Sequence, residues 1–178
     1  MDNVSEALPG YAPEIGRWLW ALADARRRTR LALEDLSQPI VDWRNPHGGN
    51  SIGALLYHLA AIEVDWLYAE VLEKPWPPEL EQLFPFDIRD AQGCLIEVRD
   101  VRLEEHWHRL DVVRVALMDA FRGMSIDEFR RVRHFEQYDV TPEWVLHHLM
   151  QHEAEHRGQI GELRLQAAWE SGLHGRTV

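Results

Sequence analysis

Four long segments of the chain carry apolar residues three or four positions apart, with polar residues between them. This spacing matches the period of about 3.6 residues of an amphipathic α-helix that turns one face to a core. The segments span residues 12–36, 51–73, 95–121 and 141–170. No segment shows the sustained alternation of a half-buried strand. The pattern therefore predicts an all-α protein, a four-helix bundle with long inter-helix connections.

The segments between the predicted helices are rich in proline, glycine and asparagine, which favour loops. Residues 37–50 and 74–94 are expected to be long connections, and residues 125–140 a short turn of helix followed by an extended stretch. No long-period repeat or low-complexity tract divides the chain. Residues 1–178 are therefore expected to form a single helical domain.

Helix boundaries are marked most clearly at the last segment. Thr141 is expected to be its N-cap, with Pro142 at the first helical position and Gly172 just beyond the end. A proline there loses no helical hydrogen bond, because the first N–H groups of a helix have no partner within it. Asn50 or Ser51 is expected to cap the second segment.

Composition narrows the classes of partner. The 178 residues contain 30 acidic and 19 basic side chains, a net charge of −11. Such a chain repels phosphate groups, which predicts no nucleic acid partner and no anionic membrane surface. The local exception is Arg26–Arg28, for which we expect a solvated helix face. No apolar run reaches the ~18 residues of a membrane span, and the N-terminus lacks a signal peptide pattern, so we expect a cytoplasmic protein.

The single cysteine, Cys94, excludes a disulfide framework within the chain and a cysteine-rich metal site. As a catalytic nucleophile it would need a neighbouring base and a lowered pKa. The sequence indicates neither. The ten histidines are the more informative group.

Three of these histidines interrupt the apolar face of the last helix. His148, His152 and His156 follow one another at intervals of four residues and therefore share one side of the helix. Several buried imidazoles need polar partners, and a divalent metal satisfies the lone pairs of neutral rings. We expect His152 and His156 to bind one ion together, with His148 as a further ligand or a supporting group.

A third ligand must come from another helix. His58 is the leading candidate because it lies among the apolar positions of the second helix, and His106 on the third helix is its rival. The remaining histidines are expected to lie in loops or on the surface, without a role: His47, His108, His134, His147 and His174.

Two motifs resemble the DinB family of bacterial proteins, also called the DinB/YfiT-like metalloenzyme superfamily. They are SIGALLYHLAAIE around His58 and HEAEHRGQI at residues 152–160. The resemblance covers most of the chain, from the first helix through the fourth. It implies a four-helix bundle in which His58, His152 and His156 hold a divalent metal ion, usually nickel or zinc, and it implies a homodimer.

The resemblance describes the reaction less closely than the fold. Some DinB relatives are enzymes that use a low-molecular-weight thiol for isomerisation, transfer or detoxification, and many have no known activity. A metal held by three imidazoles lowers the pKa of a bound water or thiol. The expected function is thus a metal-dependent thiol S-transferase, acting on an electrophilic substrate, or a hydrolase. The alternative is a non-catalytic metal-binding or stress-response protein.

The general acid or base is left open by the sequence. Glu63, Glu153 and Glu155 are candidates, although the helix geometry predicts that Glu153 and Glu155 face solvent. Arg157 and Gln159 are expected to position a substrate, to support the site or to pair on the surface.

Residues 152–156 also match HExxH, the motif that supplies two ligands and a general base in zinc proteases. The residues that follow do not match the longer protease motif, and the 22 residues after His156 in this sequence are not expected to form a substrate-binding domain. A protease is therefore disfavoured.

Overall fold

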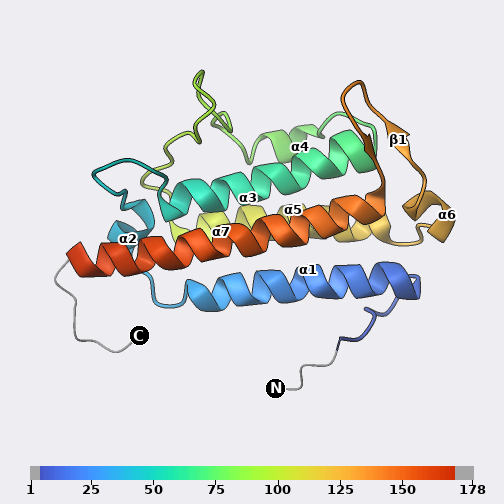
Figure 1. The fold of residues 1–178 in the computed structure, drawn as a ribbon, viewed down its shortest axis with the longest axis horizontal. Coiled ribbons are helices and arrows are strands. Elements are labelled where there is room, and N and C mark those ends of the chain that lie inside the picture. The colour runs from blue at the N-terminus through green and yellow to red at the C-terminus, as the bar shows by residue number, and fades with distance from the viewer. Residues whose placement is uncertain (1–4, 171–178) are drawn as a thin grey trace.

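The computed structural model describes residues 5–170. Four long helices lie side by side: α1 (Pro13–Ala32), α3 (Ile52–Trp66), α5 (Leu103–Phe121) and α7 (Pro142–Glu170). Helix α7 contacts both α1 and α3, and α3 also packs on α5. Figure 1 shows α7 across the front of the bundle, between α1 and α3 and with α5 behind it. The all-α fold, a four-helix bundle, is confirmed.

Short elements occupy the connections between these helices. They are α2 (Gln38–Asp42), the π-helical turn η1 (Leu67–Val71), α4 (Pro78–Glu81), α6 (Ile126–Phe129), β1 (Arg133–His134) and β2 (Asp139–Val140). Turn η1 directly continues α3. The two strands pair antiparallel, with Arg133 opposite Val140. The predicted turn of helix and extended stretch in residues 125–140 are thus found as α6 and this hairpin.

Two hydroxyl groups cap the helices that carry the histidines. The Oγ of Ser51 accepts a hydrogen bond of 3.1 Å from the Ala54 amide, so Ser51 rather than Asn50 is the N-cap of α3. The Oγ1 of Thr141 accepts one of 3.1 Å from the Trp144 amide at the start of α7. Each bond satisfies an amide that has no partner within its own helix. Gly172 lies outside the described residues.

The prediction that the third helix begins near residue 95 is wrong. Residues 88–96 instead fold back on themselves, with an antiparallel bridge between Arg89 and Leu95 and a bond of 3.3 Å from the Ile96 amide to the Ile88 carbonyl. Asp100 then adopts a φ of 57°, which no right-handed helix contains. Helix α5 therefore begins at Leu103, and Val98 is buried as part of a loop.

The first helix also ends earlier than its apolar pattern predicts. Helix α1 stops at Ala32 rather than at residue 36, and Asp35 has a φ of 59°. Leu33 nevertheless remains buried, in the same apolar cluster as Leu55 and Leu56 of α3. The apolar pattern continues beyond the end of α1 because residues after the helix, such as Leu33, are also buried.

The buried apolar side chains form two main clusters, and the histidines lie between them on α7. One cluster joins α1, η1, α5 and α7 and includes Leu149. The other joins α3, α5 and α7 and includes Ile160. His152 and His156 occupy the intervening turns of α7. The part of α7 that carries His152 and His156 is therefore held on either side by packed core.

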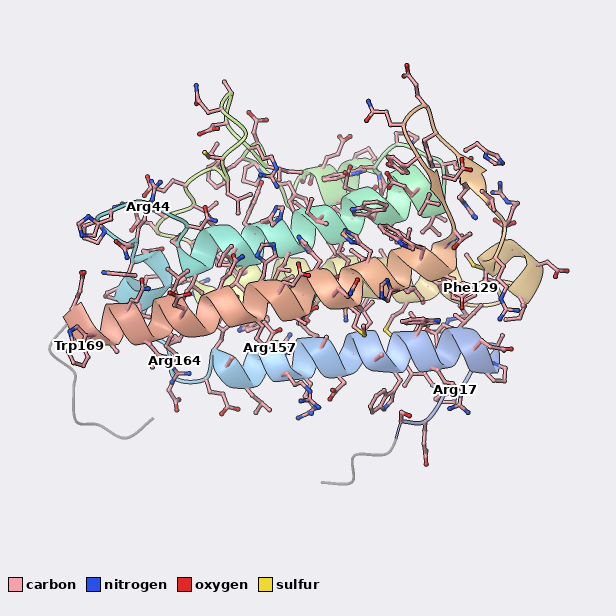
Figure 2. All side chains as sticks on the ribbon, viewed as in Figure 1. Arg17, Arg44, Phe129, Arg157, Arg164 and Trp169 are labelled. Atoms are coloured by element: carbon pink, nitrogen blue, oxygen red, sulfur yellow. The ribbon has the colours of Figure 1, made fainter. Side chains whose placement is uncertain are left out.

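Helix α7 is joined to α1 by two arginine side chains. Arg157 Nη1 donates to the Ala25 carbonyl at 3.4 Å, and Arg164 Nη1 donates to the Ala32 carbonyl at 2.7 Å. Figure 2 shows both side chains reaching from α7 toward α1. Arg157 thus links helices instead of facing the histidines.

Within residues 5–170, none of the helices combines the length and the apolar character that a membrane-crossing segment requires.

Candidate metal centre

Three imidazole rings meet where α3 faces α7. The Nε2 atom of His152 lies 3.1 Å from that of His58 and 3.0 Å from that of His156. One ring nitrogen from each residue lies within 4.8 Å of the other two. His152 and His156 are one helical turn apart, so their rings project from the same side of α7. His58 reaches them from α3.

The donor atoms suit a divalent metal ion. Two nitrogen ligands of a tetrahedral ion, each at ~2.0–2.1 Å from it, are about 3.3 Å apart. The distances of 3.0 and 3.1 Å between neighbouring Nε2 atoms are close to this value. Three neutral imidazoles can therefore share one ion without a large movement of either helix.

Hydrogen bonds among the three rings cannot satisfy all three Nε2 atoms. A neutral imidazole has one N–H group and one lone pair. The Nδ1 of His156 lies 3.0 Å from the acceptor Oε1 of Gln159, which assigns its proton to Nδ1 and its lone pair to Nε2. His152 Nε2 then stands between two other Nε2 atoms and can donate well to only one of them. An ion would accept a lone pair from all three.

The environment favours the neutral rings that metals bind. Burial, together with the neighbouring His156, lowers the pKa of His58 to about 4. Burial and the neighbouring imidazoles lower the pKa of His152 to about 3, and burial also lowers the pKa of His156. Arg89, in the loop between α4 and α5, adds a positive charge that lowers the pKa of all three. At neutral pH the three rings are therefore uncharged, which is the form that binds a metal ion.

The two rival histidines lie elsewhere. His106 is buried on α5, near Gly53 at the start of α3, and is not part of the three-residue cluster. His148 stacks on Trp144 with ring centroids 5.0 Å apart and contacts Trp66 at 4.7 Å. Its ring centroid is 5.8 Å from that of His152, so it lies next to the cluster without belonging to it.

Three of the other histidines lie on the surface, as expected, whereas His147 does not. His47, His108 and His134 are exposed, and His147 is half-buried with its ring 5.8 Å from that of Trp18. His174 lies outside the described residues. Cys94 is exposed, in the loop before α5.

The buried histidines predict how the stability of the metal-free protein depends on pH. The pKa of His106 is lowered to about 4 by burial and by the Arg109 charge, against an ordinary value of 6.5. Between these values the unfolded chain binds more protons than the folded chain, so the stability from this group is complete above pH 6.5 and falls as the pH drops. Glutamine does not titrate in this range. We therefore expect the free energy of unfolding to fall less in His106→Gln than in the wild type between pH 7 and pH 5.

This comparison is made by urea denaturation with a chelator present. It is made between variants because burial raises the pKa of Asp65 and Glu70, which acts in the opposite direction. The control is His108→Gln, which changes an exposed residue on the same helix and should behave as the wild type. Equal losses in the wild type and His106→Gln would contradict the prediction.

The prediction that Glu153 faces solvent is wrong, and Arg26 likewise does not lie on a solvated face. Glu153 is 2% exposed, Glu63 3%, Arg26 6% and Arg114 9%. Glu155 is exposed, as expected. The two buried carboxylates are bound to the two buried guanidinium groups, so neither is positioned as a free general base.

These four residues form a charge network that ties the four long helices together. Arg26 of α1 donates to Glu63 of α3 at 2.9 Å and to Glu153 of α7 at 2.8 Å. Arg114 of α5 donates to the same two carboxylates at 2.5–3.1 Å. Burial alone would raise the pKa of Glu63, but Arg114 and Arg26 outweigh it and hold that pKa below its ordinary value.

Sequence reasoning missed Arg26, Arg114 and Arg89 as residues of the site region. For Arg26 a signal was present, because it follows Leu22 by four residues and precedes Thr29 by three, on the buried side of α1. Arg89 left no such signal. It lies in a loop whose path over the bundle depends on tertiary contacts.

An all-α bundle with three converging imidazoles from two of its helices is a scaffold of the kind that holds a metal ion within a helix bundle. The particular family follows from comparison with known proteins. The family model of the DinB superfamily matches residues 21–160, which is more than half of the chain, and the chain belongs to this superfamily. In a direct comparison, no curated protein sequence matches the chain.

Proposed function

We propose that His58, His152 and His156 hold one divalent ion, Zn²⁺ or Ni²⁺, and that the chain is a metal-dependent enzyme that joins a low-molecular-weight thiol to an electrophilic substrate. The observation that carries this proposal is the convergence of three Nε2 atoms at 3.0 and 3.1 Å between neighbours. Imidazole nitrogen is a good ligand for both metals.

The number of protein ligands favours catalysis over a purely structural metal. Structural zinc sites have four protein ligands, whereas catalytic sites have three and an open position. Among the described residues, the cluster contains three ligand side chains and no fourth. When bound, the ion would act as a Lewis acid that lowers the pKa of a water or thiol bound to it.

The protein groups around the cluster support this role. Gln159 accepts a hydrogen bond from His156 Nδ1 and so orients its ring. The positive charge of Arg89 favours an anionic ligand, such as a thiolate, beside the imidazoles. Trp66 and Trp144 pack around His148 next to His152 and offer apolar surface for the electrophile.

A thiol test separates this proposal from its alternatives, a hydrolase and a non-catalytic metal-binding or stress-response protein. Protein purified without an affinity tag is first analysed for its metal content. Cobalt is then substituted, because Co²⁺ occupies sites of similar geometry and reports its ligands by colour. We expect a low-molecular-weight thiol to add a sulfur-to-cobalt charge-transfer band in the near ultraviolet, since thiolate is a strong ligand for such ions.

Absence of that band for a panel of cellular thiols, with cobalt demonstrably bound, would contradict the thiol-dependent reaction. Turnover of ester or amide substrates would then favour the hydrolase. A lack of any turnover or exogenous ligand would favour the non-catalytic role.

The remaining assignments are part of the same proposal. We infer that residues 1–178 form a single DinB-like domain, that the protein is a cytoplasmic homodimer and that it does not bind nucleic acid. The last inference is supported by the arginine run, because Arg26 is buried and both Arg27 and Arg28 are paired with Asp24 at 2.6 and 2.7 Å.

A further inference from the structure

A pocket of about 370 Å³ lies next to the histidine cluster, between α7 and the loop that precedes α3. Gln159, which is hydrogen-bonded to His156, forms part of its wall. Leu55, one helical turn before His58 on α3, forms another part. The pocket thus adjoins both helices that supply the imidazoles. Its size is within the range of small-molecule sites.

The lining of this pocket is unusually rich in side-chain amides. Asn45, Asn50, Gln159 and Gln166 line it together with a single charged residue, the carboxylate Glu162. Asn45 Nδ2 donates to Gln166 Oε1 at 3.1 Å, and Gln166 Nε2 donates to Glu162 Oε1 at 3.0 Å. Within residues 5–170, these bonds leave Glu162 Oε2 and Gln159 Nε2 without a protein partner. The Asn50 side chain, which also lines the pocket, has no partner among these residues either. The pocket therefore offers amide donors and acceptors and a single anionic acceptor to a ligand.

The charge beside the histidine cluster and the charge in the adjoining pocket differ in sign. Arg89 places positive charge near the imidazoles, whereas Glu162 is the charged group that lines the pocket. Glu162 follows His156 by six residues on α7, which corresponds to about 9 Å along a helix. A ligand that reaches from the imidazoles to Glu162 must span at least this distance, which is about the length of three extended residues.

Resting on the metal site proposed above, we propose that this amide pocket binds the polar extension of the ligand whose reactive end lies at the imidazoles. The ligand is a peptide-sized molecule with amide groups and a terminal ammonium group. Its amides bind the carboxamide side chains, Gln159 among them, and its ammonium group binds Glu162. A ligand with a carboxylate at that end is rejected, because it would face Glu162 directly.

Four synthetic thiols test this assignment on the cobalt-substituted protein. Mercaptoacetyl-glycine 2-aminoethylamide has the amides and the terminal ammonium group. Its propylamide analogue ends in a methyl group, mercaptoacetyl-glycyl-β-alanine ends in a carboxylate, and mercaptoacetamide has no extension. Affinities are measured from the sulfur-to-cobalt charge-transfer band, so no catalytic turnover is required.

We expect the ammonium-bearing probe to bind at least about tenfold more tightly than the propylamide, and mercaptoacetamide to bind more weakly than both. The variant Glu162→Gln should reduce the preference for ammonium over methyl to within about twofold. The matched control is Glu155→Gln, which removes the same charge from an exposed position of α7 that does not line the pocket, and should keep the preference.

The outcomes separate the two proposals. If none of the four thiols produces the band while cobalt is bound, the thiol-dependent function fails. If all four bind equally, or if the preference survives in Glu162→Gln, the pocket assignment is overturned and the proposed function stands. Tightest binding of the carboxylate-bearing probe would overturn the assignment of charge.

Discussion

Replacement of His58, His152 or His156 by alanine is expected to weaken divalent metal binding by more than about 100-fold, because loss of a ligand exceeds the loss seen for groups that only orient one. The three Nε2 atoms lie close enough to share one ion, so each variant is expected to remove one bond from the proposed metal site. The measurement is titration of the metal-free variants with Zn²⁺ and Ni²⁺ by calorimetry.

The matched control is His108→Ala, an exposed histidine of α5 that takes no part in the cluster, and we expect its affinity to equal that of the wild type. Circular dichroism checks that each variant remains helical. Stoichiometric metal in the double variant His152→Ala, His156→Ala would contradict the assignment. Full affinity in His58→Ala would leave the pair on α7 but exclude the third ligand.

The second large effect is expected from the buried charge network. The variant Glu63→Gln keeps the shape of the side chain and removes its charge, which leaves Arg26 and Arg114 with one carboxylate, Glu153, between them. Breaking a buried ion pair by removing one partner costs about 3–5 kcal/mol, because a charge is left uncompensated away from water. For a domain of this size that is a fall in Tm of about 6–20 °C.

An exposed ion pair between α1 and α5, the helices that carry Arg26 and Arg114, serves as the control. Arg30 of α1 and Asp111 of α5 are 2.5 Å apart, with side chains 41% and 55% exposed. Asp111→Asn should cost no more than about 1 kcal/mol, since water screens such pairs. Both variants are measured by urea denaturation at pH 7. Equal costs for Glu63→Gln and Asp111→Asn would mean that the buried network does not hold the bundle together.

The buried network also shows where the charge of a side chain misleads a prediction of its burial. Arg26, Glu63 and Glu153 each follow a buried leucine by four residues, so all three lie on the inward sides of their helices. Charge alone predicts a solvated position for such a residue. The burial becomes favourable only because two positive and two negative groups meet, and each resides on a different helix.

The sequence alone determined the features that depend on residues close together in the chain. Apolar spacing predicted the four long helices, Thr141 and Pro142 marked the start of α7, and the interval of four residues placed His152 and His156 on one side of it. These features follow from the geometry of a single helix, in which residues four apart are neighbours whatever surrounds them.

Which distant residues meet depends on how the helices and loops pack together. The tertiary structure brought His58 of α3, rather than His106 of α5, to the histidine pair, and it joined the loop around Asn45 to α7 to form the amide pocket. It also replaced the expected first turns of α5 by a loop that carries Arg89. Contacts of this kind depend on how whole helices pack and where loops cross them, and packing responds to the summed burial of many side chains rather than to any local spacing.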